Sequence, residues 1–426
     1  MTFQKICVLG LGYIGLPTSS TFAAHGLFVV GVDCNDEVVN GLQNGRLHIS
    51  EPGMDTALQD SLQSGRLIIR SQPETADAFI IAVPTPFYED KKADLRAVIS
   101  ASESIVPYLQ KGNLVILEST SPPRTTVDVV APILERSGLK AGRDFYLAYS
   151  PERVLPGQIL RELVENARVI GGVDRASAEK GRELYAVFVR GEIVLTDATT
   201  AEMVKLMENT YRDINIAIAN EFSRLADRFD VDIWEAIEIA NLHPRVKILQ
   251  PGPGVGGHCI GVDPWFLVEA APDITPLIRT SREVNDAQPA FVVDQLARFM
   301  PQGLAGCRLA VLGLTYKANV NDFRESPALK IVRILQSKGV EVAGYDPYLP
   351  ETGLAGIATY KSLPDAVRGA DGIVLLVGHT EFRKLSPFDV AGWMRGRFVM
   401  DIAHILDRGA WQAAGLSVRV LSGGGR

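Results

Sequence analysis

The sequence has little cysteine, few aromatic residues and no paired metal-ligand spacing. Its 426 residues include four cysteines, and tryptophan, tyrosine and phenylalanine together make up 7% of the chain. No Cys-x-x-Cys or His-x-x-x-His pattern occurs, which argues against a zinc site, and the scatter of the thiols argues against a disulfide framework. We therefore expect no metal centre and a reducing, cytoplasmic location. The cysteines are Cys7, Cys34, Cys259 and Cys307.

Long apolar runs and an excess of basic charge are also missing. No apolar stretch approaches the roughly 20 residues that span a bilayer. Residues 1–5 hold no charged stretch leading into an apolar segment, so we expect neither a membrane span nor a leader. Lysine and arginine number 43 against 50 aspartates and glutamates, a formal net charge of −7. Because nucleic acids are bound by basic surfaces, we expect no nucleic-acid partner.

The rest of the composition is that of a soluble globular protein. Hydrophobic residues make up 46% of the chain and charged residues 22%, which are ordinary values for folded proteins. A chain of this length exceeds a single hydrophobic core of ordinary size, so we expect two or three domains.

A glycine-rich turn follows the first predicted strand. Lys5–Leu9 has the apolar pattern of a buried strand, residues 10–15 read Gly-Leu-Gly-Tyr-Ile-Gly, and a helix is predicted over Leu16–His25. Glycines at these spacings permit a tight turn, the approach of a pyrophosphate to backbone N–H groups, and close packing of helix on strand. The alternative is a glycine turn in a generic α/β unit. With strand and helix in register, the pattern favours dinucleotide binding.

An acidic residue ends the second predicted strand. Phe28–Val32 leads into Asp33, which follows Gly10 by 23 residues. A carboxylate at about this spacing bonds the adenosine ribose hydroxyls in dinucleotide-binding units. Cys34 and Asn35 come next, and no arginine is present to accept a 2′-phosphate, so the pattern favours NAD over NADP.

Polar or proline-rich loops follow several further strands. Ligands of open parallel sheets lie at the carboxyl ends of strands, so Thr85, Thr120 and Glu152 are placed to face a cofactor or substrate. Each of the three could instead be a turn residue or a helix cap. The predicted strands are Leu67–Arg70, Ala78–Val83, Leu114–Leu117 and Phe145–Ala148.

A long helix is predicted in the middle of the chain. Thr199 and Glu202 have the spacing of a capping box, and nothing breaks a helix from there to about Phe229. A helix this long and apolar commonly spans domains or packs on a copy of itself, so we expect a homodimer formed through it. Its apolar stripe comprises Met203, Leu206, Met207, Tyr211, Ile214, Ile218 and Phe222.

Three polar residues form a line along this helix. Lys205, Asn209 and Arg212 occupy positions i, i+4 and i+7. A solvated face is the ordinary explanation of such a line. Asparagine is a poor helix former that can donate to an oxyanion, however, and a lysine beside a hydroxyl can shuttle its proton.

A loop rich in glycine and proline presents a single thiol. Residues 250–264 read Gln-Pro-Gly-Pro-Gly-Val-Gly-Gly-His-Cys-Ile-Gly-Val-Asp-Pro, a composition that excludes a regular helix or central strand. Asp263 follows Cys259 by four residues, one helical turn if the chain coils. Cys259 is either a small buried hydrophobe or a nucleophile with an acid/base partner. His243 and Arg245 precede the loop and could either cap a helix or hold a phosphate.

The alternation of strands and helices begins again near the C-terminus. Arg308–Leu312 is a predicted strand, and the turn after it carries the single glycine Gly313. One glycine in place of three favours a mononucleotide or nucleotide sugar over a second dinucleotide. Lys317 and Arg324 flank the turn and could neutralise a diphosphate. Later strands are predicted over Val340–Tyr345, Gly372–Val377 and Arg397–Ile402.

With these motifs in place, the whole chain resembles the nucleotide-diphosphate-sugar 6-dehydrogenase family, whose members oxidise UDP-glucose and GDP-mannose. The resemblance is carried by residues 10–17, 118–120, 149–153, 256–260 and 323–327. Within the family, the chain is most similar to members that act on UDP-N-acetyl-D-mannosamine in bacterial surface-polysaccharide synthesis. This closer similarity is carried by residues 82–87, 152–157, 243–246, 249–259 and 262–265.

The resemblance implies a four-electron oxidation of the sugar C6 alcohol to a carboxylate by two successive NAD⁺ molecules. Lys205 would donate and accept the proton at the C6 oxygen. Cys259 would add to the aldehyde to give a thiohemiacetal, hydride loss would make a thioester, and water near Glu152 would hydrolyse it. Lys205 and Asn209 would stabilise the oxyanion, and Asp263 would orient or deprotonate the thiol.

The resemblance also implies contacts with both ligands, and it places His243 and Arg245 in the site of the partner subunit. The expected NAD contacts are Gly10, Gly12, Tyr13, Ile14, Gly15, Asp33, Thr85, Thr120 and Thr126. The expected UDP-sugar contacts are Arg153, Val154, Lys205, Asn209, Arg212, His243, Arg245, Gly256, Tyr316, Lys317 and Arg324. We expect an NAD-binding Rossmann-like domain over 1–196, a central helical and dimerisation domain with the cysteine loop over 197–298, and a UDP-sugar-binding α/β domain over 299–426.

One position departs from the family pattern, and several alternatives stay open. Relatives carry a basic residue shortly after the last strand, where this chain reads Asp401-Ile402-Ala403-His404, so either His404 supplies that contact or it is absent. The substrate could be UDP-N-acetylglucosamine or UDP-glucose, because epimers differ by the orientation of one group. A two-electron alcohol dehydrogenase and a non-catalytic nucleotide-sugar sensor are the remaining alternatives.

Overall fold

The chain forms two compact units. The structure, a computed structural model, describes residues 3–257, 259–300 and 303–423. Unit 1 consists of Met1–Glu208 with Trp265–Ile274, and unit 2 of Asn209–Pro264 with Thr275–Arg426. Each unit contains one sheet with its own hydrophobic cores.

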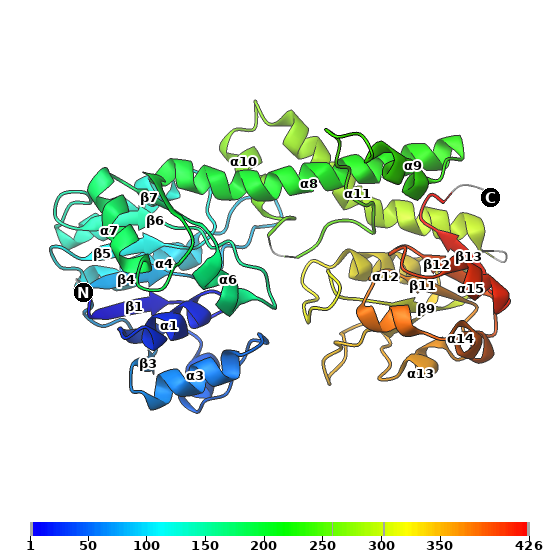
Figure 1. Ribbon diagram of the computed structural model, residues 1–426, viewed down its shortest axis with the longest axis horizontal. Helices are drawn as coiled ribbons and strands as arrows, with labels where there is room; N and C mark the ends of the chain where they lie inside the picture. Colours follow the sequence, from blue (N-terminus) through cyan, green and yellow to red (C-terminus); the bar gives the residue numbers. More distant parts are fainter. Residues whose placement is uncertain (1–2, 258, 301–302, 424–426) are drawn as a thin grey trace. The chain divides into compact units, whose positions relative to one another are not determined.

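Unit 1 is built on an eight-stranded sheet in the order β3-β2-β1-β4-β5-β6-β7-β8 (Figure 1). All neighbouring strands are parallel except β6 and β7. The order reverses between β1 and β4, which is where open α/β sheets bind ligands. The strands are β1 Lys5–Leu9, β2 Phe28–Val32, β3 Leu67–Arg70, β4 Ala78–Ile81, β5 Leu114–Leu117, β6 Tyr146–Tyr149, β7 Arg168–Gly172 and β8 Ile193–Asp197.

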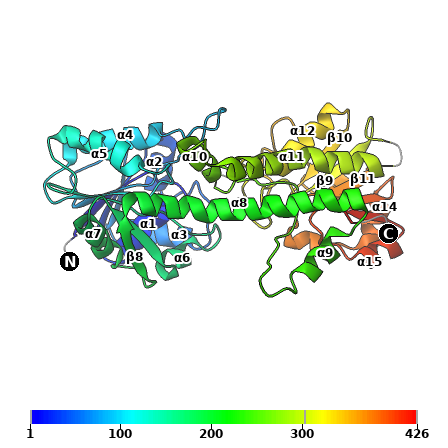
Figure 2. The same ribbon diagram turned by 90° about the horizontal axis from the view of Figure 1, so that it is seen from above.

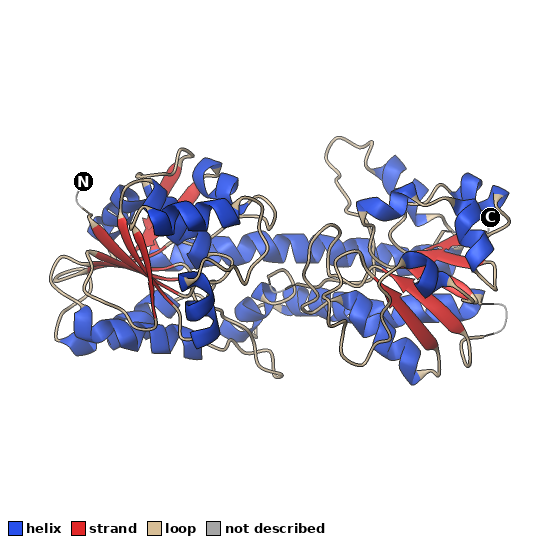
Figure 3. Cartoon of the chain, turned by 90° about the horizontal axis from the view of Figure 1, so that it is seen from below, coloured by secondary structure: helices blue, strands red, loops and turns tan. Residues whose placement is uncertain are grey.

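Helices cover both faces of this sheet (Figure 3). Alternate strand residues supply the two cores: Val8 belongs to one and Cys7 to the other, as expected where successive side chains point to opposite faces. The first face is covered by α1 Gly15–Ala24, α2 Asp36–Gln43, α3 Met54–Gln63, α6 Ile159–Glu165 and α7 Arg175–Tyr185; the second by α4 Arg96–Ile105, the π-helical turn η2 Thr126–Val130, α5 Ala131–Leu134 and the start of α8 Ala198–Phe229.

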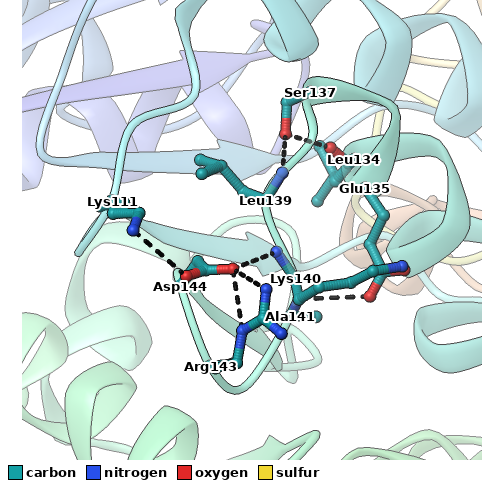
Figure 4. Close-up of polar contacts among 9 residues, drawn as sticks. All are labelled: Lys111, Leu134, Glu135, Ser137, Leu139, Lys140, Ala141, Arg143 and Asp144. Carbon is teal, nitrogen blue, oxygen red and sulfur yellow. Dashed lines mark hydrogen bonds and ion pairs between the residues drawn. The ribbon is translucent and has the colours of Figure 1, made fainter.

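A polar turn leads into β6. The carboxylate of Asp144 accepts the backbone N–H of Lys140 at 2.9 Å and pairs with the guanidinium of Arg143 at 2.8 Å and with Lys111 at 3.7 Å (Figure 4). The cationic partners are exposed, so these ion pairs contribute little stability individually. The backbone bond closes the turn from which β6 runs towards Glu152.

Unit 2 contains a five-stranded parallel sheet in the order β10-β9-β11-β12-β13. Its order reverses between β9 and β11. The strands are β9 Arg308–Leu312, β10 Glu341–Tyr345, β11 Gly372–Leu375, β12 Phe398–Asp401 and β13 Ser417–Val420. One face packs on α9 Ile233–Ala240, α11 Pro276–Phe299 and α12 Pro327–Ser337, and the other on α13 Leu363–Val367, the 3₁₀ turn η4 Thr380–Lys384, α14 Pro387–Trp393 and α15 Arg408–Ala413.

Within unit 2, α11 runs beside the second half of α8, and buried polar groups join the two helices (Figure 2). Arg282 pairs with Asp213 at 2.5 Å, and both side chains are almost completely buried. Asn285 donates to the same carboxylate at 2.8 Å and accepts from Asn220 at 2.9 Å. Asn220 in turn accepts the N–H of Gly252 at 3.0 Å. The glycine-rich loop is therefore bonded to α8 directly and to α11 through Asn220 and Asn285.

The predicted fold class is confirmed: two doubly wound α/β sheets are connected through a long helix with further helices around it. The predicted capping box is wrong. Thr199 lies inside α8, and Asp197 accepts the N–H of Thr200 at 2.9 Å. Glu202 does not bond back to the start of the helix. Its side chain is fully buried, and its carboxylate accepts from Thr126, since a buried polar group needs a hydrogen-bond partner.

Three strands, β7, β8 and β13, are absent from the sequence prediction. β7 begins with Arg168 and ends with two glycines, and β8 is an edge strand with a weak apolar pattern. Sheet pairing stabilises β7 in spite of its arginine and glycines, and the side chains of β8 are only partly buried or exposed, as strand formation depends strongly on context. The three-domain division stays a prediction. In the described part of the chain, no helix is long and apolar enough to cross a bilayer.

Candidate active site

The glycine turn of unit 1 approaches neighbouring backbone so closely that side chains are excluded at two positions. Gly10 has a φ of +90°, and a Cβ there would lie 2.6 Å from the carbonyl oxygen of Ala82. A Cβ on Gly15 would lie 1.8 Å from the carbonyl oxygen of Gly10. A Cβ on Gly12 would meet nothing within 4 Å. Gly10 and Gly15 therefore shape the turn, whereas Gly12 leaves open space over its backbone.

Asp33 joins the turn to the end of β2. One carboxylate oxygen accepts the N–H of Leu11 at 2.9 Å and the other accepts the N–H of Asn35 at 2.9 Å. The side chain remains partly exposed, so each oxygen keeps capacity for a further donor. Tyr13 and Ile14 are also partly exposed at the turn. Open space over Gly12 beside an accessible carboxylate fits a dinucleotide pyrophosphate and ribose.

The carboxyl ends of β4 and β5 meet through Thr85, whose hydroxyl donates to the carbonyl of Thr120 at 2.6 Å. Thr126 lies elsewhere: it is fully buried, and its hydroxyl and N–H both donate to Glu202, at 2.6 and 2.8 Å. Burial of Glu202 raises the pKa of its carboxyl despite these bonds. Thr126 as a cofactor contact therefore stays a prediction.

Glu152 belongs to a buried charge cluster at the end of β6. Arg168 donates to Glu152 at 2.5 Å, to Glu118 at 3.2 Å and to the hydroxyl of Ser150 at 3.0 Å. Tyr185 donates to Glu118, and its ring lies 4.1 Å from the guanidinium of Arg168. Burial, reinforced by the charge of Glu152 and opposed by Arg168, raises the pKa of the Glu118 carboxyl from 4.5 to about 7.

The two residues after Glu152 serve structural contacts. Arg153 pairs with Glu208 of α8 at 2.7 Å and donates to the carbonyl of Ala167 at 3.3 Å. Val154 packs on the core of unit 1. Their assignment to the substrate stays a prediction.

In unit 2, the glycine loop lies against the turn that follows β9. A Cβ on Gly257 would lie 2.8 Å from the ring of Tyr316, and a Cβ on Gly256 would lie 2.6 Å from both the carbonyl oxygen of Glu325 and Cδ of Pro327. The N–H of Gly257 donates to the carbonyl of Arg324 at 3.2 Å. Only glycine permits this contact between the two loops.

The backbone coils between Cys259 and Asp263. The carbonyl of Cys259 accepts the N–H groups of Val262 and Asp263 at 3.0 and 2.9 Å. Asp263 is 2% exposed, and its carboxylate accepts the side-chain amide of Asn209 at 2.6 Å. Cys259 itself is partly exposed. An accessible thiol, a buried carboxylate and an amide donor are the groups that an activated nucleophile and its oxyanion need.

Charged side chains surround Tyr316. Burial, and then Asp322 and Cys259, raise the pKa of the Tyr316 phenol, whereas Arg324 and Arg212 lower it. Arg324 forms a two-pronged pair with Asp322, with bonds of 3.0 and 2.7 Å. Residues assigned by sequence to the thiol and to the nucleotide sugar therefore lie together in unit 2.

The remaining predicted residues have their own surroundings. Lys205 is buried on α8, one helical turn before Asn209. His243 and Arg245 are exposed, and the N–H of Arg245 donates to the imidazole of His243 at 3.3 Å. His404 has a φ of +49° and stacks on Trp234 with 4.1 Å between ring centroids. His258 lies outside the described residues.

Sequence patterns do not identify the buried charges that hold the site. Glu118 belongs to one of the motifs that carry the family resemblance, but the motif assigns it no role. Arg168 resembles an ordinary surface arginine. Only the fold brings both to Glu152. Asp213 and Arg282 lie 69 residues apart and pair with each other beside the cysteine loop. The one available signal is an acidic or basic residue within an otherwise apolar helix or strand.

The chain matches three parts of one protein family along its length. Residues 4–189 match the NAD binding domain of the UDP-glucose/GDP-mannose dehydrogenase family, residues 199–287 its central domain and residues 310–408 its UDP binding domain. The first match contains the glycine turn and Glu152, the second contains Asn209 and Cys259, and the third contains Tyr316.

Individual relatives are similar over almost the full chain. A UDP-N-acetyl-D-mannosamine dehydrogenase of Methanocaldococcus jannaschii is 49% identical, covering 99% of this chain and 97% of that protein. An NDP-N-acetyl-D-galactosaminuronic acid dehydrogenase of Ralstonia solanacearum is 46% identical, covering 97% and 98%. The solved structure of a UDP-D-ManNAc dehydrogenase from Pyrococcus horikoshii is 43% identical with a TM-score of 0.90, covering 98% of this chain and 99% of that one.

Gly12→Ala and Gly10→Ala should separate cofactor binding from folding. We expect Gly12→Ala to change the unfolding free energy by less than about 0.5 kcal/mol, yet to raise KM for NAD roughly tenfold, because its methyl group blocks the approach of the pyrophosphate. Gly10→Ala should lose about 2 kcal/mol of stability from its positive φ and its clash. Urea unfolding and NAD titrations measure both; an unaltered KM in Gly12→Ala would contradict this account of the turn.

Glu118→Gln should change the pH dependence of stability. The folded pKa of about 7 lies above the ordinary 4.5, so the folded state binds more protons between these values and the wild type loses stability as pH rises through them. We expect about 3 kcal/mol of unfolding free energy to be lost over this range relative to Glu118→Gln. Urea melts from pH 4.5 to 8 check this, with the exposed Glu165→Gln as control; parallel curves for all three proteins would refute it.

Proposed function

The chain belongs to the UDP-glucose/GDP-mannose dehydrogenase family, is an NAD-dependent UDP-sugar dehydrogenase, and on that premise we propose that it oxidises the C6 alcohol of UDP-N-acetyl-D-mannosamine to the carboxylate through a covalent thioester on Cys259. The observation that carries the proposal is the backbone turn that joins the partly exposed Cys259 to Asp263, whose buried carboxylate accepts the amide of Asn209. The likeness to relatives named for N-acetyl-D-mannosamine and for N-acetyl-D-galactosaminuronic acid supports an N-acetylated sugar.

Unit 1 supplies the cofactor site in this proposal. Gly10, Gly12 and Gly15 form the turn that approaches the pyrophosphate, and Asp33 accepts from the ribose. Tyr13, Ile14, Thr85, Thr120 and Thr126 are the further proposed contacts. When bound, NAD⁺ accepts a hydride, and two molecules in succession account for the four electrons removed from each sugar.

The reaction at the sugar C6 carbon uses three side chains, those of Lys205, Cys259 and Asn209. Lys205 takes the proton of the C6 hydroxyl and returns a proton when an oxyanion forms. Cys259 adds to the aldehyde carbon, because a trigonal aldehyde has no second hydride to give until it becomes tetrahedral. The amide of Asn209 stabilises the oxygen of this adduct. Asp263, held by Asn209, orients the thiol or takes its proton.

Glu152 serves the last step, in which water cleaves the thioester and releases Cys259. Its carboxylate orients the water and accepts a proton from it. The bond from Arg168 at 2.5 Å fixes the position of this carboxylate. The proposed contacts to the nucleotide sugar are Arg212, Gly256, Tyr316, Lys317 and Arg324, together with Arg153 and Val154.

We also propose a homodimer formed through α8. Five large side chains on the unit 2 part of this helix are exposed, with 39 to 70% of their surface accessible, and successive members are separated by seven, four, three and four residues. That spacing places them on one face of the helix, as in a helix–helix seam. They are Tyr211, Ile218, Phe222, Leu225 and Phe229. Across such an interface, His243 and Arg245 of each subunit are the proposed contacts to the partner's substrate.

The number of NADH molecules formed per sugar tests the proposed reaction. We expect two NADH per UDP-N-acetyl-D-mannosamine consumed, with slower turnover of UDP-N-acetylglucosamine, UDP-N-acetylgalactosamine and UDP-glucose. Absorbance at the NADH band and mass spectrometry of the product measure both quantities. Equal turnover of UDP-glucose would refute the substrate assignment, one NADH per sugar would indicate a two-electron dehydrogenase, and no signal with any sugar would indicate a sensor.

Cys259→Ser should separate the two oxidations. We expect the variant to form no more than one NADH per sugar and no sugar acid, because a serine hydroxyl is a far weaker nucleophile than a thiolate. Cys307→Ser, which alters a buried cysteine bonded to the carbonyl of Gly303, is the matched control and should retain two. Full acid production by Cys259→Ser would eliminate the thioester.

Phe222→Asp should convert the dimer to a monomer, because a carboxylate in an apolar seam is desolvated without a partner. Glu221→Ala, at the neighbouring exposed position outside the seam, should leave the dimer intact. Sedimentation velocity at micromolar concentration measures the difference. A wild-type protein that sediments as a monomer would disprove the proposed interface.

A further inference from the structure

The turn after β9 in unit 2 repeats the turn after β1 in unit 1. Residues 8–13 read Val-Leu-Gly-Leu-Gly-Tyr, and residues 311–316 read Val-Leu-Gly-Leu-Thr-Tyr. In both sheets, the turn glycine has a positive φ, +90° for Gly10 and +83° for Gly313. Each glycine N–H donates to the carbonyl of the last residue of the neighbouring second strand, at 2.8 and 2.9 Å. The two turns are therefore structurally equivalent.

The equivalence extends to the acid at the end of the second strand. Leu11 donates its N–H to Asp33 at 2.9 Å, and Leu314 donates its N–H to Asp346 at 2.7 Å. In unit 1 this acid is the proposed ribose acceptor. Asp346 thus occupies the position from which a dinucleotide ribose would be bound in unit 2.

Thr315 fills the space that Gly12 leaves open. The side chain of Thr315 is fully buried, and its hydroxyl lies 3.0 Å from the carbonyl of Lys317 and 3.1 Å from the imidazole of His379. A Cβ at Gly12 would meet nothing within 4 Å. The approach of a pyrophosphate over the turn is therefore blocked in unit 2.

His379 occupies the carboxylate of Asp346. This histidine follows β11, is fully buried, and places its Nε2 3.0 Å from the carboxylate of Asp346. Asp346 also accepts the N–H groups of Thr315 and Tyr348, at 3.1 and 2.9 Å. Burial alone would raise the pKa of Asp346, but the bonds from His379 and the backbone outweigh it and leave this pKa below its ordinary value. The carboxylate is satisfied without a ligand.

The second nitrogen of His379 determines its protonation. The N–H of Asn319 donates to Nδ1 at 3.0 Å. A backbone N–H can only donate, so Nδ1 carries no proton, the ring is neutral, and its one N–H is on Nε2, facing Asp346. His379 therefore joins the acid of β10 to the backbone of the segment that follows the turn.

Asn319 provides the other attachment of this segment. Its φ of +62° is a left-handed conformation that asparagine tolerates. Its side chain donates to the hydroxyl of Thr380 at 2.9 Å and accepts the N–H of Thr380 at 3.0 Å. Residues 315–319 are thus held at both ends by His379 and Thr380, and Tyr316 and Lys317 lie between the two attachments.

We propose that His379 is a positioning residue for UDP-sugar binding: with Asp346 it converts the dinucleotide position of unit 2 into a latch that holds Tyr316 and Lys317 in place for the nucleotide. The inference rests on the proposed assignment of these two residues to the UDP-sugar. The Tyr316 ring also lies against Gly257, so the latch holds the surface on which the cysteine loop packs.

Two substitutions separate the two bonds of the imidazole. The amide oxygen of His379→Asn can occupy the place of Nδ1 and accept from Asn319, but the shorter side chain does not reach Asp346, which keeps only its backbone donors. The amide of His379→Gln reaches further and can donate to Asp346, but nothing accepts from Asn319. Only the second variant removes the His379 attachment of the segment that carries Tyr316, whereas only the first leaves the buried carboxylate without its side-chain donor.

Binding of UDP alone, measured by calorimetry, tests the latch without requiring turnover. We expect His379→Gln to weaken UDP binding roughly five- to tenfold, the scale of one lost hydrogen bond. His379→Asn should bind UDP within about twofold of wild type while melting at a lower temperature. KM for NAD should be unchanged in both, since the proposed NAD site is in unit 1. UDP affinity equal to wild type in His379→Gln, or losses that follow the melting temperatures of the two variants, would overturn the proposal.

Asn319→Gly keeps the test decisive if His379→Gln does not fold. Glycine accepts the positive φ and lies at an exposed position, and it removes both side-chain bonds to Thr380. It should weaken UDP binding to a similar extent, and wild-type affinity in this variant would also count against the latch. Failure of the wild-type protein to bind UDP would overturn the proposed function together with the latch, whereas normal wild-type binding with unaffected variants would overturn the latch alone.

Discussion

A carboxylate at the end of the second strand, bonded to the backbone of the turn after the first, is the interaction on which both sheets depend. Asp33 and Asp346 each accept an N–H from a leucine that follows a glycine of positive φ. The bond sets the turn at the point where the strand order reverses, and ligands of such sheets gather there. The two carboxylates differ in what else they bind. Asp33 stays accessible, whereas Asp346 accepts further bonds from His379 and backbone donors.

The buried charged groups around the proposed catalytic residues also have hydrogen-bond or ion-pair partners. A charge removed from water is tolerated only with a partner. Arg168 is shared by Glu118 and Glu152, Asn209 bonds Asp263, and Arg282 bonds Asp213 beside the cysteine loop. Glu152 is thereby held by Arg168, which has no proposed part in the reaction, whereas Asp263 is held by Asn209, which does. Such support is the usual requirement for a precise active site.

The sequence predicted the elements that have strong local signals and missed those that depend on distant partners. The glycine turn, the acid of β2 and the long helix α8 each follow from spacing within about 30 residues. The prediction for the start of α8 is wrong because threonine is a common N-cap residue, which made Thr199 the expected cap. In the structure, Asp197 accepts the N–H of Thr200, and Glu202 accepts from Thr126. Strand β7, with an arginine and two glycines, forms only because its neighbours supply a ladder.

By itself, the sequence determined the fold class, the dinucleotide turn and the family, because glycine spacing, strand patterns and short motifs are local properties that need no knowledge of contacts. Tertiary structure alone decided which charges meet. The pairing of Glu118 with Arg168, the closure of Asp346 by His379, and the stacking of His404 on Trp234 join residues 50, 33 and 170 positions apart. Pairings over such separations leave no periodic trace in the chain, since burial and hydrogen bonding arise only when the sheets bring their loops together.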